Sequence, residues 1–116
     1  MQKPNVAVTT ERFYMEHVDV HGLNSLRRHV NRYKWAAQKV ARRELVLDAG
    51  CGSGYGDHIL LATCQQVIGV DKSPEAIEYA QWKADKQRAS HRLDYLVADL
   101  SDFKVEQPVD AIVCVE

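Results

Sequence analysis

The stretch VLDAGCGSGYG, residues 46–56, decides the fold. It overlaps a short apolar run, Leu45 to Leu47, of the kind found in a strand that is buried on both faces. Asp48 ends the run, and glycine follows at positions 50, 52, 54 and 56. Because glycine has no Cβ, such a segment can turn sharply and lie close to a bound molecule. The pattern predicts a strand, a tight loop and then a helix whose free N–H groups favour an anion.

Helical and extended patterns alternate on both sides of this loop. Ser73, Pro74 and Glu75 form a strong helix start, with a capping hydroxyl, a proline in the first turn and an acid near the positive end of the dipole. Strands that alternate with helices imply an α/β fold with a parallel sheet and right-handed crossovers. The predicted helices cover residues 24 or 25 to 43, 55–64 and 73–88, and the predicted strands cover residues 45–47, 67–70, 93–97 and 109–115.

The first predicted helix follows a segment without a clear pattern. Residues 1–22 are interpreted as an N-terminal arm and residues 23–116 as the domain. Asn24 or Ser25 is expected to cap the helix. An apolar stripe at helical spacing then predicts which side packs on the sheet. The stripe consists of Leu26, Val30, Tyr33, Ala37 and Val40, and Trp35 is also interpreted as a packing residue.

Composition excludes several classes of protein. The chain has 116 residues, of which 46% are hydrophobic and 27% charged, and this balance indicates one soluble globular domain. Its formal net charge of −1 argues against nucleic-acid binding. The three cysteines lack CxxC spacing, so we expect no disulfide framework or zinc site and infer a cytoplasmic location. No signal-peptide pattern and no apolar run of membrane-spanning length is present, so we expect no membrane association.

A second acid indicates the ligand. Asp71 ends the next predicted strand, 21 positions after Gly50, where a carboxylate can accept hydrogen bonds from both hydroxyls of a ribose. The pair predicts a site for an adenosine-type ligand. A nicotinamide dinucleotide site would need glycine or alanine at the sixth position of its glycine motif, and the two possible frames place Tyr55 or Asp57 there.

Four stretches together resemble the successive motifs of class I S-adenosylmethionine (SAM)-dependent methyltransferases. They are VLDAGCGSGYG (46–56), VIGVDKSPEAIEYA (67–80), YLVADLSDF (95–103) and VDAIVCVE (109–116). The segment HVNRYKWAA (29–37) also resembles the lead-in helix of small-molecule members. The resemblance implies a Rossmann-like sheet with strand order 3-2-1-4. It also implies methyl transfer from SAM to a small-molecule acceptor, with S-adenosylhomocysteine as the product.

The same resemblance assigns roles to residues of the loop and of the strand ends. The backbone of Gly50, Cys51 and Gly52 would pass beneath the methionine part of SAM. Asp48 would help to hold the ammonium group through water, and Asp71 would bind the ribose hydroxyls. The remaining roles follow at the outer strands: Lys72 would flank the adenine, Asp99 would accept from the adenine amino group beside the Leu100 backbone, and the Cys114 carbonyl would face the ammonium group.

Some of these residues also have simpler interpretations. Asp99 would serve equally as a surface residue that ends a strand. The Cys51 thiol invites a nucleophilic role, although small residues are common in such loops. His17 and His21 have the spacing of helical metal ligands but lack a third ligand, so we interpret them as solvated. Contact of SAM or substrate with Tyr14, Arg28 or Tyr33 is a further possibility.

The chain supplies four of the family's seven strands. Two right-handed crossovers in one direction place both helices on one face, so we expect the other face to be largely bare. That exposure favours either a truncated chain or a homo-oligomer that covers the face. Because half of the substrate pocket would then be missing, we name no catalytic residue. A SAM-binding module that acts through a partner is the alternative to an enzyme.

Overall fold

The structure is a computed structural model that describes the backbone of residues 20–115 and the side chains of residues 25–115. Most of the predicted N-terminal arm lies outside these residues, and so do Tyr14, His17 and the His21 side chain. Within the described part, no helix is both long and apolar enough to cross a bilayer.

The described elements form a four-stranded parallel sheet with three helices. They are α1 (Val20–Lys39), β1 (Leu45–Ala49), α2 (Tyr55–Leu60), β2 (Gln66–Asp71), α3 (Pro74–Lys86), β3 (Leu93–Val97) and β4 (Ala111–Val113). The strand order is β3-β2-β1-β4, and every neighbouring pair is parallel. The predicted α/β class, Rossmann-like order and parallel pairing are therefore confirmed.

Element ends differ from the sequence prediction where local contacts intervene. Helix α1 begins at Val20, before both expected caps, and ends at Lys39 instead of continuing to Arg43. The chain turns there because Arg42 adopts a φ of 69°, and its N–H bonds to the Thr63 carbonyl at 2.8 Å. Helix α2 ends at Leu60 rather than near Cys64, and the segment between them forms a turn.

Strand β4 is shorter than predicted, while β3 has the predicted bounds. Three residues of β4 pair with β1, from Ala111 opposite Val46 to Val113 opposite Asp48. The Asp110 carboxylate fixes the start of this pairing, because Oδ2 accepts from the N–H groups of Glu44 and Leu45 at 3.0 Å each. The Asp110 N–H also bonds to the Leu45 carbonyl at 2.8 Å, so the backbone and the side chain of Asp110 together hold the start of β4 against β1.

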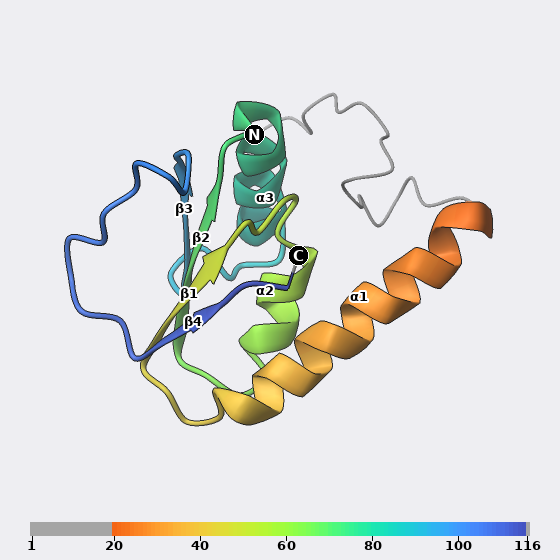
Figure 1. Cartoon of the computed structure of the whole chain (residues 1–116), viewed down its shortest axis with the longest axis horizontal. Helices are drawn as coiled ribbons and strands as arrows, with labels where there is room; N and C mark the ends of the chain where they lie inside the picture. The colour runs from red at the N-terminus through yellow and green to blue at the C-terminus, as the bar shows by residue number, and fades with distance from the viewer. Residues whose placement is uncertain (1–19, 116) are drawn as a thin grey trace.

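The two faces of the sheet are covered differently. All three helices lie on one face, as predicted, and the connection from β3 to β4 runs along the other (Figure 1). On the helical face, Val46, Val67 and Leu93 belong to the main buried cluster. On the opposite face, a smaller cluster of Leu47, Ile68 and Val70 is partly covered by side chains of the connection, including Phe103 and Val109. This face is thus less bare than expected, although Ile112 remains 64% exposed.

One packing prediction on α1 is wrong. Tyr33 is buried with 3% of its surface exposed, but Trp35 is 63% exposed. The two residues lie two positions apart, and on a helix with 3.6 residues per turn they point in different directions. Instead of entering the core, the Trp35 ring lies 5.4 Å from the Lys39 ammonium.

Candidate cofactor site at the glycine loop

The predicted site residues gather at the carboxyl edge of the sheet. Asp48 lies in β1 opposite Val113 of β4, so Cys114 follows directly at the same edge. Asp71 ends β2, and its carbonyl accepts from the Ala98 N–H at 3.0 Å, which places Asp99 just beyond. Because the strands are parallel, their carboxyl ends meet, and ligands of open α/β sheets bind there.

The glycine loop is held by the end of β2. The Gly50 and Cys51 N–H groups both bond to the Val70 carbonyl, at 2.8 and 2.9 Å. The Gly52 N–H bonds to Asp71 Oδ2 at 2.9 Å, and the Ser73 N–H bonds to Asp71 Oδ1 at 3.0 Å. Asp71 therefore lies against the loop as its spacing predicted, and it connects the loop to the first turn of α3.

The four glycines of the loop have two different surroundings. Gly50, Gly52 and Gly54 have positive φ angles of 78°, 57° and 85°. A Cβ built on Gly50 or Gly52 would meet no atom within 4 Å. A Cβ on Gly54 would lie 2.6 Å from the Tyr95 hydroxyl, and one on Gly56 would lie 2.2 Å from the Tyr33 ring. The first two glycines thus border open space, and the last two border the core.

Asp48 lies beneath the loop rather than on its surface. Its side chain is 0% exposed, and its Oδ2 accepts a hydrogen bond from the Tyr33 hydroxyl at 2.9 Å. A ligand above the loop would interact with this carboxylate only indirectly. The sequence is compatible with Tyr33 as a packing residue or as a ligand contact, and it gives no sign of this bond.

Asp57 is a buried acid that the sequence motifs do not assign to the site. It lies in α2, it is 0% exposed, and its carboxyl adjoins Asp48 and Tyr95. Burial and the nearby charge of Asp48 raise the pKa of Asp57 well above its usual range. An acid directly after the last glycine of the loop, in the first turn of α2, was the available sequence signal.

Cys51 is also enclosed. Its side chain is 2% exposed. Burial raises the pKa of the thiol strongly, and the carboxylates of Asp57, Asp48 and Asp71 add to the effect. The thiol therefore stays protonated, which removes the basis for a nucleophilic role.

Residues at the outer end of the site are exposed. Lys72, Asp99 and Leu100 all face solvent. Asp99 Oδ1 accepts from the Ser101 N–H at 3.0 Å and from the Ser101 hydroxyl at 2.9 Å. These bonds lower the pKa of Asp99, and the nearby Lys72 ammonium contributes in the same direction. The carboxylate is therefore ionised and positioned by its own turn.

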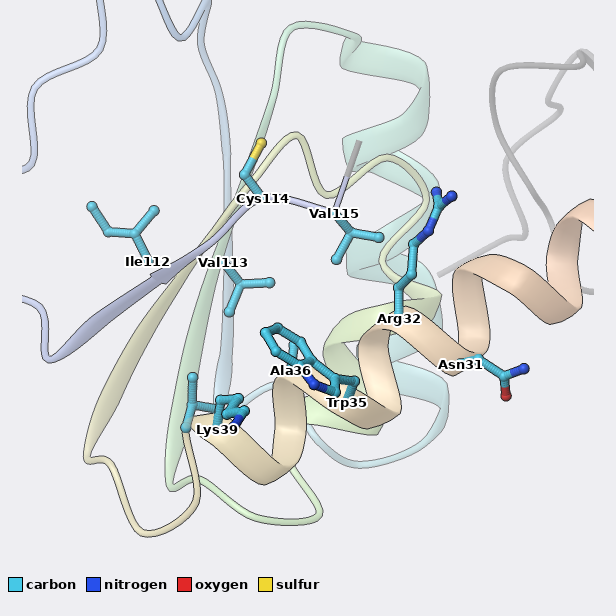
Figure 2. A pocket seen from close by; sticks show the side chains of 10 residues that line it. Asn31, Arg32, Trp35, Ala36, Lys39, Ile112, Val113, Cys114 and Val115 are labelled. Atoms are coloured by element: carbon cyan, nitrogen blue, oxygen red, sulfur yellow. The ribbon is translucent and has the colours of Figure 1, made fainter.

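A groove of about 580 Å³ lies between α1 and β4. Figure 2 shows Val113 and Val115 pointing towards α1, whereas Ile112 and Cys114 point to the opposite side of β4. The rest of the lining comes from Asn31, Arg32, Trp35, Ala36, Lys39 and Val40. Among residues 25–115, no three His, Cys, Asp or Glu side chains gather as metal ligands would.

With this geometry in place, comparison with known proteins identifies the family. A family model described as "Methyltransferase domain" matches residues 46–116. The chain belongs to the SAM-dependent methyltransferases. SAM is the cofactor of this family, and the match begins at the glycine loop described above.

Two known methyltransferases are similar to this chain over only part of their own length. A "Probable S-adenosylmethionine-dependent methyltransferase" of Mycobacterium tuberculosis is 31% identical over 88 residues, which cover 75% of this chain and 30% of that protein. The "Ribosomal protein L11 methyltransferase" of Burkholderia cenocepacia is 41% identical over 58 residues, covering 48% of this chain and 19% of that protein. The chain therefore spans less than a third of the length of these methyltransferases.

A solved methyltransferase structure has the same fold. The SAM-dependent methyltransferase from Thiobacillus denitrificans, in complex with S-adenosylhomocysteine, superposes with a TM-score of 0.61 at 22% identity. The match covers 74% of this chain and 35% of that one. This likeness shows that the four-stranded sheet corresponds to part of a larger methyltransferase fold.

Proposed function

We propose that the chain binds SAM at the glycine loop and forms the cofactor-binding part of an enzyme that methylates a small-molecule acceptor. One observation carries the proposal: Asp71 and the Gly50–Gly52 turn lie together at the carboxyl edge of the sheet, joined by the 2.9 Å bond to the Gly52 N–H. A ribose carboxylate and an unobstructed backbone turn are the two features that an adenosine ligand requires.

The residues present fit this cofactor. Neither Gly50 nor Gly52 has an atom within 4 Å of the place that a Cβ would take, so the methionine part of SAM can lie against their backbone. Both oxygens of Asp71 accept backbone bonds, and because a carboxylate oxygen can accept more than one hydrogen bond, ribose hydroxyls can bond to the same group. The bound cofactor supplies the reactive methyl group on its sulfonium.

The outer residues would orient the rest of the ligand. The Asp99 carboxylate is ionised and exposed, as an acceptor for the adenine amino group must be, and the Leu100 backbone follows it. Lys72 lies near Asp99 and would flank the ring. Across the sheet, the Cys114 carbonyl and the buried Asp48 would face the ammonium end, and the Cys51 backbone would pass beneath the methionine part.

The class of acceptor rests on the lead-in helix. Residues 29–37 resemble those of small-molecule methyltransferases, and this part of α1 contributes to the lining of the groove beside β4. The Burkholderia relative is named for a ribosomal protein substrate, so a protein acceptor is the competing outcome. Methyl transfer assays with radiolabelled SAM on fractionated extract would distinguish the two, because labelled product would appear in either the small-molecule or the protein fraction.

A binding module without turnover is the second candidate. Binding of SAM without labelled product in any fraction would support the module. Labelled product formed by the purified chain would support the enzyme.

Association with a second copy in the cytoplasm completes the proposal. Leu96, Leu100 and Ile112 are 46%, 45% and 64% exposed, and a second copy packed on them would remove these apolar side chains from water. The cytoplasmic location stays a prediction from cysteine usage. Light scattering across a dilution series should give the mass of a dimer, and a monomer at every concentration would contradict the association.

Calorimetry with S-adenosylhomocysteine tests the cofactor site. We expect Asp71→Ala to weaken binding about 100-fold, because two hydrogen bonds to a charged group are lost. Asp110→Ala is a matched control, since Asp110 also accepts two backbone N–H bonds but lies before β4, at the opposite edge of the sheet. Equal weakening by both variants, or no binding by the unmodified chain, would contradict the proposal.

A further inference from the structure

The groove between α1 and β4 has an apolar floor and a basic rim. Ala36, Val40 and Val113 belong to its lining and are all buried. Arg32 and Lys39 of α1 also line it, and both side chains are exposed. No Asp or Glu belongs to α1 or to the described residues that line the groove. The groove therefore combines apolar contact surface with positive charge.

Trp35 lies between the two cations along α1. Positions 32, 35, 36 and 39 are three or four residues apart, so their side chains project from one face of the helix. Figure 2 shows Arg32 at the end of the groove near Val115 and Lys39 at the other end. The Trp35 ring is 63% exposed although it lines the groove. It offers a broad apolar surface to a molecule that enters there.

One end of the groove adjoins the proposed cofactor site. Cys114 and Val115 contribute to the lining, and they follow β4 at the carboxyl edge of the sheet. The ammonium end of the cofactor is proposed to lie at this edge, beside the Cys114 carbonyl. A molecule in the groove would therefore approach the methionine part of the cofactor from the side of α1.

Size and charge select among the possible occupants. The groove volume of about 580 Å³ lies within the range of about 300–1,000 Å³ that is usual for small-molecule sites. A second copy placed against this groove through the same face would bring identical cations against Arg32 and Lys39, and like charges repel. A cationic small molecule would meet the same repulsion. An apolar small molecule with a negative charge suits both the volume and the charge.

We propose that the groove binds a small apolar molecule that carries a carboxylate, with its apolar part against Trp35 and Val113 and its carboxylate at Arg32. The planar guanidinium can donate two parallel hydrogen bonds to a carboxylate. Because this site adjoins the cofactor, the molecule that it binds is the methyl acceptor, and in this respect the inference rests on the proposed function.

Binding of 2-naphthoate tests the groove, with the neutral 2-naphthalenemethanol and the cationic 2-naphthylmethylamine as matched probes. Nuclear magnetic resonance follows the indole N–H signal of Trp35, and the buried Trp82 serves as an internal reference. We expect the carboxylate to bind about fivefold more tightly than the alcohol and the amine to bind most weakly, because only the carboxylate gains charge-assisted hydrogen bonds. The proposal is overturned if the Trp35 signal does not shift, or if the alcohol binds as tightly as the carboxylate.

Two charge-reversal variants separate the groove from the general charge of α1. Arg32→Glu should weaken naphthoate binding about tenfold and strengthen binding of the amine, because the charge at the proposed carboxylate position is reversed. Lys34→Glu makes the same change at an exposed residue that does not line the groove. It should leave naphthoate affinity within about twofold, as expected of a screened surface charge. Equal weakening by both variants would contradict the proposal.

A titration with both ligands separates this inference from the proposed function. Saturating S-adenosylhomocysteine should leave naphthoate affinity within about threefold, because ligands at two uncoupled sites bind independently. Mutual exclusion would place naphthoate in the cofactor site and overturn the inference. Failure of the unmodified chain to bind S-adenosylhomocysteine in calorimetry would contradict the proposed function, while the naphthoate titrations would still decide whether the groove binds a carboxylate.

Discussion

The two glycine pairs of the loop share the same alternating spacing but have opposite surroundings. Gly50 and Gly52 turn the chain with positive φ and leave the space beside them open. Gly54 and Gly56 instead receive the side chains of Tyr95 and Tyr33 from the core. The difference teaches that one alternating pattern meets two separate requirements: close approach of a ligand, and close packing of a helix on the sheet.

Substitutions at Gly54 and Gly56, the core-facing pair, should lower stability the most. A Cβ at Gly56 would lie 2.2 Å from the Tyr33 ring, which is buried and bonded to Asp48. We expect Gly56→Ala to lower the free energy of unfolding by about 3 kcal/mol, because overpacking outweighs the gain in helix propensity. Urea unfolding measures the change. A loss below about 1 kcal/mol would remove the distinction between the two pairs.

Substitutions at Gly50 and Gly52, the ligand-facing pair, should weaken cofactor binding the most. The Cβ of Gly52→Ala would meet no protein atom, so only backbone strain of about 1–2 kcal/mol is expected in stability. The added methyl group would occupy the space of the cofactor, and S-adenosylhomocysteine should bind at least tenfold more weakly in calorimetry. Gly50→Ala offers a second test of the same kind. Unchanged affinity in both variants would place the ligand elsewhere.

The raised pKa of Asp57 should affect how the stability of the chain depends on pH. Because the pKa of Asp57 is raised in the folded chain, the folded state retains a proton that the unfolded state releases above the ordinary aspartate pKa of 3.8. As the pH rises above this value, the unmodified chain should lose stability relative to Asp57→Asn, by at most about 1.4 kcal/mol per pH unit. The free energy of unfolding of both proteins is measured by urea unfolding between pH 4 and 7. If it changes with pH by the same amount in both, the raised pKa of Asp57 is contradicted.

Much of the fold was predictable because its signals are local. Ser73 caps α3 by accepting from the Ala76 N–H at 3.2 Å, as the Ser-Pro-Glu sequence predicted. Strand β3 has the predicted bounds, and Asp71 lies against the loop at the spacing expected for a ribose ligand. The end of α1 was not predictable, since it depends on a bond from Arg42 to Thr63, 21 positions further along the chain.

The sequence by itself determined the α/β class, the order of the elements and the acids at the carboxyl edge of the sheet. These follow from periodicity, caps and short spacings, which neighbouring residues encode. Only the tertiary structure divided the glycines into two pairs, exposed Trp35 and placed Asp57 against Asp48. The reason is that each of these depends on side chains from separate elements, and no local pattern specifies which of them meet when the helices pack on the sheet.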